Sequence, residues 1–194
     1  VKRMEDFLGK KTRSYGHLTN VIRLIGGTPV YTPTGETYEA LARGVVDIIS
    51  VWPLDSQASF KFHEIAPFIF DYGSGQYSAV GIVMNLDRYN QLPQDIKDAM
   101  LEVRNEGLLA FPKIWEKRGQ NAVKVMAAGG AKFYRWSPEE IERMKKIIVP
   151  QLWNDYLSKM QKDQPGVPVR EFFDKALVLY EKNKHLSTYK QLPF

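Results

Sequence analysis

The stretch that decides the predicted fold is GGTPVYTPTGETYEALARGVVD, residues 26–47. Its two opening glycines can end a preceding helix, because glycine alone enters left-handed backbone space without steric cost, and residues 28–31 then form a short extended run. A turn at Pro33 leads into a helix that ends at Gly44. The apolar side chains of that helix fall on one side: Tyr38, Leu41 and Ala42. The apolar run at residues 45–49, broken by a single aspartate, predicts a strand covered on both faces.

These elements make one α/β unit, and strands and helices continue to alternate in the residues before and after it. A strand at residues 11–14 and a helix at residues 17–25 are expected before it. After it, a helix starts at Pro53, residues 64–72 are extended, and residues 77–85 are a candidate for a buried strand. Sheets of this class bind small ligands at the carboxyl ends of their strands, so we expect the site there.

The second half of the chain is predicted to be mainly helical. Leu92-Pro93 is a start signal for a long helix, which Pro112 should kink or break. Residues 131–136 alternate enough to form a strand. The segment 137–140, SPEE, is a capping box that begins another helix, and a last helix is expected at residues 170–182.

Composition narrows the class of protein. The chain has 194 residues, of which 44% are hydrophobic and 25% charged, an ordinary globular composition. It has no cysteine, which excludes disulfides, thiolate zinc sites and cysteine nucleophiles. The net charge of +5 is spread along the chain rather than gathered in one stripe. This spread argues against a nucleic-acid partner and is compatible with the attraction of small anions.

Catalytic and metal-binding motifs are missing from the sequence. The histidines His17, His63 and His185 are far apart and have no carboxylate or serine partner at a characteristic spacing. The sequence contains no GxSxG, HExxH, Walker or GxGxxG motif. We therefore predict no catalytic residue, no metal and no cofactor, although an oxygen-only metal site assembled from loops stays open. A small α/β enzyme acting on an acidic substrate is the alternative to a binding protein.

Four segments, in this order, resemble TRAP-transporter periplasmic solute-binding proteins of the DctP type. Residues 6–16, DFLGKKTRSYG, are similar to the family's DLKGLKIRVPG, and residues 35–47 resemble its SEVYTALQTGVVDG box. Residues 61–65, KFHEI, resemble KFYEV. Residues 83–101 are similar to VINKKKWDSLPPEDQKIL. Any one match is weak, whereas the ordered set is specific.

The resemblance implies an α/β, periplasmic-binding-protein-like architecture with two lobes. This chain would hold roughly the C-terminal two-thirds of it, lacking an N-terminal portion of one lobe. Residues 1–80 would form the α/β ligand-binding lobe, residues 81–130 a hinge-crossing strand and long helix, and residues 131–194 a returning strand and C-terminal helices. The implied protein is a periplasmic receptor, with its signal peptide outside this sequence. It would bind a small organic anion, expected to be a carboxylate, and pass it to membrane permease subunits. A homodimer is compatible with this.

The candidate ligand-binding residues flank the opening stretch. Arg13 ends a predicted strand, where a guanidinium can hold a carboxylate by paired, charge-assisted bonds, and in the resembled family the matching arginine is the main anchor. Trp52 follows the apolar strand and can form an aromatic wall. The further candidates are Thr34, Ser50, Asp55 and Tyr77. Structural roles stay open for each: a surface ion pair, core packing, or a helix cap or turn. The loop at residues 49–53, ISVWP, departs from the family pattern, which leaves the ligand's identity open.

Overall fold

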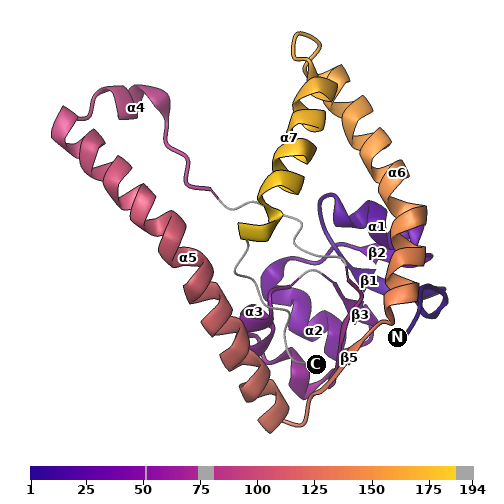
Figure 1. Cartoon of the computed structure of the whole chain (residues 1–194). Coiled ribbons are helices and arrows are strands. Elements are labelled where there is room, and N and C mark those ends of the chain that lie inside the picture. The colour runs from indigo at the N-terminus through magenta and orange to yellow at the C-terminus, as the bar shows by residue number, and fades with distance from the viewer. Residues whose placement is uncertain (51, 74–80, 187–194) are drawn as a thin grey trace.

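The computed structural model describes residues 1–50, 52–73 and 81–186. Short strands and helices form a base, and two helical arms extend from it (Figure 1). The strands are β1 (Lys11–Arg13), β2 (Thr28–Val30), β3 (Ile48–Ile49), β4 (Phe68–Asp71) and β5 (Lys132–Arg135). The α-helices are α1 (Leu18–Leu24), α2 (Thr37–Ala42), α3 (Leu54–Ser59), α4 (Leu86–Asn90), α5 (Gln94–Ala128), α6 (Pro138–Asp163) and α7 (Val169–Asn183). The 3-10 turns are η1 (Met4–Phe7), η2 (Thr34–Glu36), η3 (Phe62–Glu64) and η4 (Lys184–Leu186).

Three parallel strands form a sheet in the order β2-β1-β3, so β1 is its central strand. Arg13 at the end of β1 is in register with Val30 of β2 and with Ile49 of β3. The chain therefore crosses from one side of β1 to the other between β2 and β3. In α/β sheets such a reversal of strand order opens a crevice at the carboxyl end of the central strand. The strands predicted at residues 11–14 and 28–31 are confirmed.

The third strand is shorter than predicted. β3 holds only Ile48 and Ile49, whereas Val45 is exposed and Val46 is buried without joining the sheet. Asp47 turns its carboxylate onto the backbone N–H of Lys11, at 2.8 Å. A side-chain acceptor thus satisfies the first N–H of β1, and the backbone N–H of Asp47 donates to Lys11 O at 2.8 Å, so contact between the two strands begins at Asp47 rather than at Val45.

The main core gathers around Phe7, which is fully buried. Its ring contacts Phe70, Tyr72 and Trp136 edge-on, with ring centroids 5.9, 6.2 and 6.2 Å away. The apolar face of α1 and two residues of α6 complete this core: Leu18, Val21, Ile22, Met144 and Ile148. Segments from both ends of the sequence therefore share one core. Burying several large aromatic rings supplies much of the hydrophobic stabilisation of such a core.

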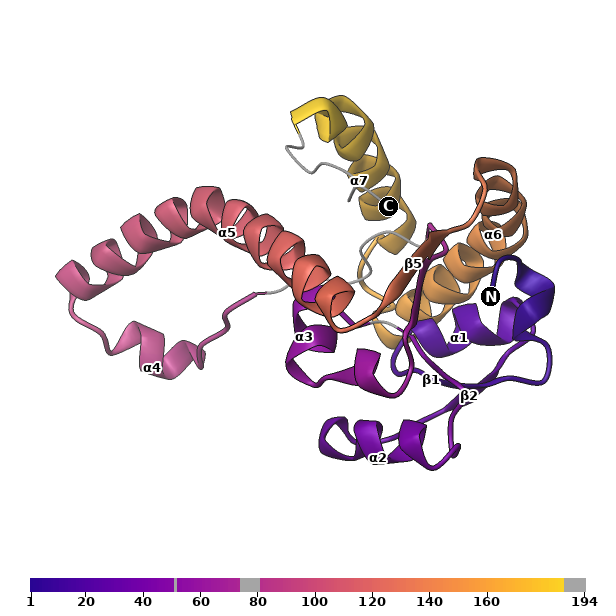
Figure 2. The same cartoon turned by 90° about the horizontal axis from the view of Figure 1, so that it is seen from below.

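A second, two-stranded parallel sheet pairs β4 with β5. Ile69 of this sheet packs with Ala122 and Met126 of α5, and Leu54 and Ala58 of α3 lie against the same cluster. Figure 2 shows α3 beside the C-terminal end of α5, where the long helix joins the base. The rest of α5 extends away from the base and bears α4 at its far end.

The long helix passes through Pro112 without a break, since α5 is continuous from Gln94 to Ala128. Figure 2 shows it bowed along its length. The predicted break at Pro112 is absent, and a kink there stays a prediction. The next helix, α6, begins at the predicted cap. The Ser137 hydroxyl accepts a hydrogen bond from the backbone N–H of Glu140 at 3.2 Å, which satisfies one of the free donors at the helix start.

Two other predictions fail. In α2 the buried residues are Thr37 and Ala40, whereas Tyr38 and Leu41 of the predicted apolar side are half-buried and Ala42 is exposed. Thr37 is held inward by hydroxyl contacts with Pro33 O at 3.0 Å and Thr32 Oγ1 at 3.2 Å. The strand predicted at residues 77–85 is wrong for residues 81–85, which form no regular structure, and residues 77–80 lie outside the described part. No described strand pairs with 81–85, and an unpaired strand is not stable.

Candidate functional site

Arg13 is a buried cation at the carboxyl end of the central strand. Only 2% of the residue is exposed, although a charged side chain rarely leaves water without a partner. Nη2 donates one hydrogen bond, to the carbonyl oxygen of Thr32 at 3.3 Å. Nε and Nη1 are buried and have no partner among the described residues. The guanidinium therefore holds unused donors at the carboxyl end of the central strand, which suits recognition of a planar anion.

Two aromatic rings lie against this guanidinium. Its carbon Cζ is 4.8 Å from the ring centroid of Tyr15 and 5.1 Å from that of Trp52. Both distances fall in the range in which a ring face attracts a cation. Trp52, predicted as an aromatic wall beside the anchor, is thus brought to Arg13 by the fold.

Burial lowers the pKa of the Arg13 guanidinium, and the nearby Tyr15 and Tyr31 oppose this shift. The group keeps its charge at neutral pH, because an arginine side chain titrates far above that range. Within the described residues, no ion pair with a carboxylate is found for Arg13. The predicted alternative, a surface pair with Glu5 or Asp6, does not describe its position.

Trp52 is itself fixed by its neighbours. Its ring packs edge-on against Phe60 and Phe62, with centroids 4.9 and 5.1 Å away. Its backbone carbonyl accepts a hydrogen bond from Gln57 Nε2 at 2.8 Å. The indole Nε1 is buried and has no partner within the described residues. It is a further unused donor, on the ring that also touches Arg13.

The remaining predicted residues occupy different positions. The Ser50 hydroxyl lies 3.0 Å from the Tyr72 hydroxyl, and Ser50 N donates to Arg13 O at 3.0 Å, so Ser50 is next to the anchor. Asp55 pairs with Arg118 at 2.9 Å. Thr34 is exposed in η2. Tyr77 lies outside the described residues. The structure thus brings Arg13, Trp52 and Ser50 together and shows no contact of Thr34 or Asp55 with them.

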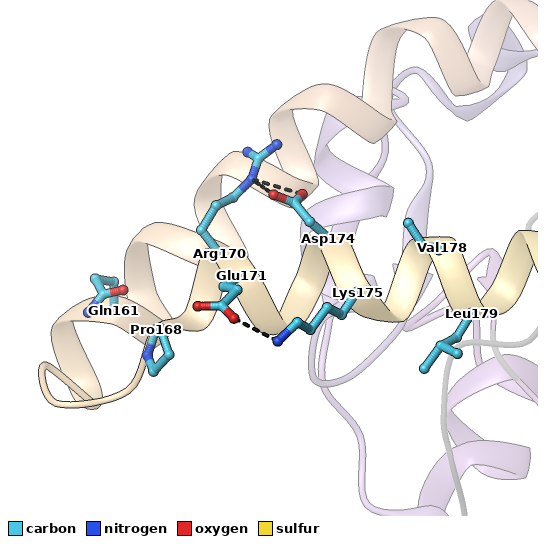
Figure 3. A pocket seen from close by; sticks show the side chains of 8 residues that line it. All are labelled: Gln161, Pro168, Arg170, Glu171, Asp174, Lys175, Val178 and Leu179. Atoms are coloured by element: carbon cyan, nitrogen blue, oxygen red, sulfur yellow. Dashed lines mark hydrogen bonds and ion pairs between the residues drawn. The ribbon is translucent and has the colours of Figure 1, made fainter.

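A groove between α6 and α7 lies on the helical arm instead (Figure 3). Its charged side chains neutralise one another, because Arg170 bonds Asp174 at 3.0 Å and Lys175 bonds Glu171 at 2.6 Å. None of the predicted ligand-binding residues lines it. We therefore place the candidate site at Arg13 and not in this groove.

The described ranges hold no cluster of three or more metal-ligating side chains of the histidine or carboxylate kind. His63 is buried against Gly129, where an added Cβ would lie 2.8 Å from the imidazole, and His17 packs edge-on against Tyr156. The described part of the chain also contains no helix that combines the length and apolarity of a membrane span.

Sequence reasoning missed Tyr15 and Thr32. Tyr15 had a readable signal, because side chains two residues apart in an extended segment point to the same face, and it follows Arg13 by two. The same alternation turns Thr12 and Ser14, whose buried hydroxyls have no partner in the described part, toward the opposite face. Thr32 acts through its backbone carbonyl, for which its side chain gives no signal.

Three known proteins show what the chain is similar to. A monocarboxylate 2-oxoacid-binding periplasmic protein of Nostoc sp. (strain PCC 7120) is 26% identical over 149 residues, which cover 76% of this chain and 41% of the relative. The C4-dicarboxylate-binding periplasmic protein DctP of Rhodobacter capsulatus is 25% identical over 149 residues, covering 75% of this chain and 44% of the relative. A TRAP periplasmic solute-binding protein of Desulfovibrio salexigens, solved with bound orotic acid, superposes with a TM-score of 0.76 at 20% identity, covering 90% of this chain and 56% of that one.

The chain thus spans about half the length of these relatives, rather than the two-thirds that its motifs suggested. The structural likeness confirms the predicted periplasmic-binding-protein-like α/β fold. Residues 1–159 match the family model described as bacterial extracellular solute-binding protein, family 7. That family consists of extracellular solute receptors rather than enzymes, and this chain belongs to it.

Proposed function

We propose that this chain is the anion-holding part of a TRAP-type solute receptor, and that Arg13 binds the carboxylate of a small organic acid. The observation that carries this is a guanidinium that is 2% exposed, has no carboxylate partner in the described part of the chain, and leaves Nε and Nη1 unused. Burying such a group without a partner is unfavourable, and a ligand carboxylate would supply the missing charge and acceptors.

The names of the relatives support the same class of ligand. The Nostoc protein is described as binding monocarboxylate 2-oxoacids, the Rhodobacter protein as binding C4-dicarboxylates, and the Desulfovibrio structure holds orotic acid. All three ligands carry a carboxylate. The region around Arg13 offers one buried cation and several rings, which suits an acid with a single anchored carboxylate.

We further propose that the receptor works outside the cytoplasm, passes its ligand to a membrane permease and performs no turnover. Trp52 is proposed as a wall of the site and Ser50 as a polar neighbour, and Thr34, Asp55 and Tyr77 remain predicted contacts. The hinge at residues 81–130 also stays a prediction. Domain closure around a ligand is the usual way in which two-lobed receptors sequester it.

The test is titration calorimetry of the full-length protein with lactate, pyruvate, succinate and orotate, repeated with Arg13→Gln and Arg13→Lys. We expect at least one acid to bind, with Arg13→Gln weakening it by about 100-fold, because a charge-assisted bidentate contact is lost. Arg13→Lys keeps the charge but not the planar fork, so it should restore binding only in part.

Arg43→Gln is the matched control, since its side chain is 77% exposed and pairs only locally with Glu39 at 3.4 Å. It should leave every affinity unchanged. Unchanged affinity in Arg13→Gln would rule out the anchor. Conversion of the acid into another compound, detected by NMR of the ligand, would instead favour the alternative function, a small α/β enzyme acting on an acidic substrate.

A further inference from the structure

We infer that Tyr15 is a movable aromatic cover over the Arg13 anchor, and that it selects carboxylates bearing an apolar or planar group next to the acid. This inference rests on the proposed function of Arg13. It assigns a specificity role to a residue on the loop between β1 and α1, a place from which α/β proteins commonly contact ligands.

The first observation is the difference in solvent exposure between Arg13 and the two rings at its guanidinium. Arg13 is 2% exposed, whereas Tyr15, whose ring centroid is 4.8 Å from Cζ, is 49% exposed. Trp52, the other ring at the guanidinium, is partly buried. Tyr15 is therefore an outer layer between the charge and solvent, and a carboxylate approaching from that side meets its ring first.

The second observation is how differently the two rings are held. Trp52 packs edge-on against Phe60 and Phe62 and is tied through its carbonyl to Gln57 at 2.8 Å. Tyr15 is followed by Gly16, whose φ of +58° lies in the left-handed region and beside open space. A half-exposed ring next to a turn with free space can swing aside, whereas a ring clamped by two others cannot.

The third observation is the chemistry left when Tyr15 swings away. Nε and Nη1 of Arg13 and Nε1 of Trp52 are buried donors without partners in the described part of the chain. A carboxylate can take the guanidinium donors with charge-assisted bonds, which are stronger than the attraction between a ring and a partly solvated cation. The ring of Tyr15 can then close on the group next to the carboxylate, while Trp52 stays fixed against Phe60 and Phe62. An apolar or planar group is preferred there, because it can pack against the rings.

The cover itself is tested without any ligand by labelling arginines with phenylglyoxal and quantifying each modified peptide by mass spectrometry. Arg43, with a side chain 77% exposed, is the internal reference. In the wild type we expect Arg13 to react about tenfold or more slowly than Arg43, since reaction needs a local opening. Tyr15→Ala should bring the two rates within about threefold of each other, and Tyr15→Phe should keep the protection.

Selectivity is tested with lactate and (R)-mandelate, which share a 2-hydroxy acid head and differ by a methyl against a phenyl group. Tyr15→Ala should weaken mandelate binding about tenfold and lactate binding less than about threefold, because only the phenyl group packs on the lost ring. The control is Tyr89→Ala, which removes another ring over a cation, 5.5 Å from Lys97 on the far arm. It should change neither the labelling nor the two affinities.

Equal loss of both acids in Tyr15→Ala would overturn the selectivity, because a merely structural role would weaken both alike. Continued protection of Arg13 in Tyr15→Ala would overturn the cover. Failure of the proposed function has a different signature: none of the acids tested binds the wild type, or those that bind also bind Arg13→Gln unchanged. In that case the proposed selectivity is wrong as well, and the labelling rates still decide whether Tyr15 covers Arg13.

Discussion

Nη2 of Arg118 lies 2.9 Å from Oδ2 of Asp55, so an ion pair ties the long helix α5 to the first turn of α3. The Asp55 side chain is 9% exposed and the Arg118 side chain 58%. Because α3 begins two residues after Trp52, the pair also fixes the segment that carries the aromatic wall. It links the candidate site to α5, part of the segment 81–130 that is predicted to cross the hinge.

Breaking this pair should destabilise the protein. Arg118→Met leaves the nearly buried Asp55 carboxylate without its partner, and we expect the free energy of unfolding to fall by about 1–2 kcal/mol, less than for a fully buried pair. Urea denaturation at neutral pH measures this. Arg104→Met on the same helix is the control, because among the described residues Arg104 bonds only its neighbour Asn105. Equal effects of the two variants would contradict a role for the pair.

Replacing the Arg13 anchor should abolish carboxylate binding without lowering the free energy of unfolding. Arg13→Met replaces a buried, partly unsatisfied guanidinium with an apolar side chain of similar length. The free energy of unfolding should stay unchanged or rise by about 1–2 kcal/mol, while carboxylate binding is lost. Urea denaturation of the ligand-free chain, beside calorimetry with the tightest acid, gives both quantities. A clear loss of stability would show that the buried charge is structural.

Gly73 is expected to tolerate no side chain. Its φ is +72°, and an added Cβ would lie 2.6 Å from Ile141 Cγ2 of α6. Gly73→Ala should lower the free energy of unfolding by roughly 2–4 kcal/mol through backbone strain and overpacking. In an Ile141→Ala background, which carries its own packing loss, Gly73→Ala should cost the backbone strain alone. Gly35→Ala, where no atom lies within 4 Å, should change stability by less than about 1 kcal/mol. Urea denaturation compares the wild type, the three single variants and the double variant.

Acid should weaken the junction between the N-terminal turn and α6. Hydrogen bonds from Arg143 hold the pKa of the Glu140 carboxyl below its ordinary value, and Glu140 also accepts from Met4 N at 2.8 Å. A lowered folded-state pKa stabilises the protein above the carboxyl's unfolded pKa, and this stabilisation is lost as pH falls through the folded value. Unfolding free energy should therefore drop below about pH 4.

Glu140→Gln tests the source of that loss. It should lower stability at neutral pH by roughly 1 kcal/mol, as expected for weakened charge-assisted hydrogen bonds, and flatten the decline in acid. Glu142→Gln is the matched control, because Glu142 pairs only with exposed Lys145, at 2.9 Å. Urea denaturation between neutral and acid pH compares the three proteins. An identical acid decline in Glu140→Gln and the wild type would contradict this assignment.

Local patterns predicted most of the elements. The strand at residues 11–14, the cap at Ser137 and the last helix follow from preferences among residues only a few positions apart, and the structure confirms them. The predictions that failed depend on partners elsewhere. Residues 81–85 have a strand-like sequence but no described neighbour to pair with, and in α2 the hydroxyl of Thr37 is held inward by its contacts with Thr32 and Pro33.

The sequence by itself determined that Arg13 ends a strand and that the chain carries the motifs of a solute receptor, because strand ends and motifs are local properties. Only the tertiary structure decided that this strand is central, with Trp52 and Tyr15 against the guanidinium and Asp55 paired to Arg118. Strand order, the burial of a charge and the choice of its partner depend on groups far apart in the chain. Local preferences do not specify which of those groups meet, and packing of the common core does.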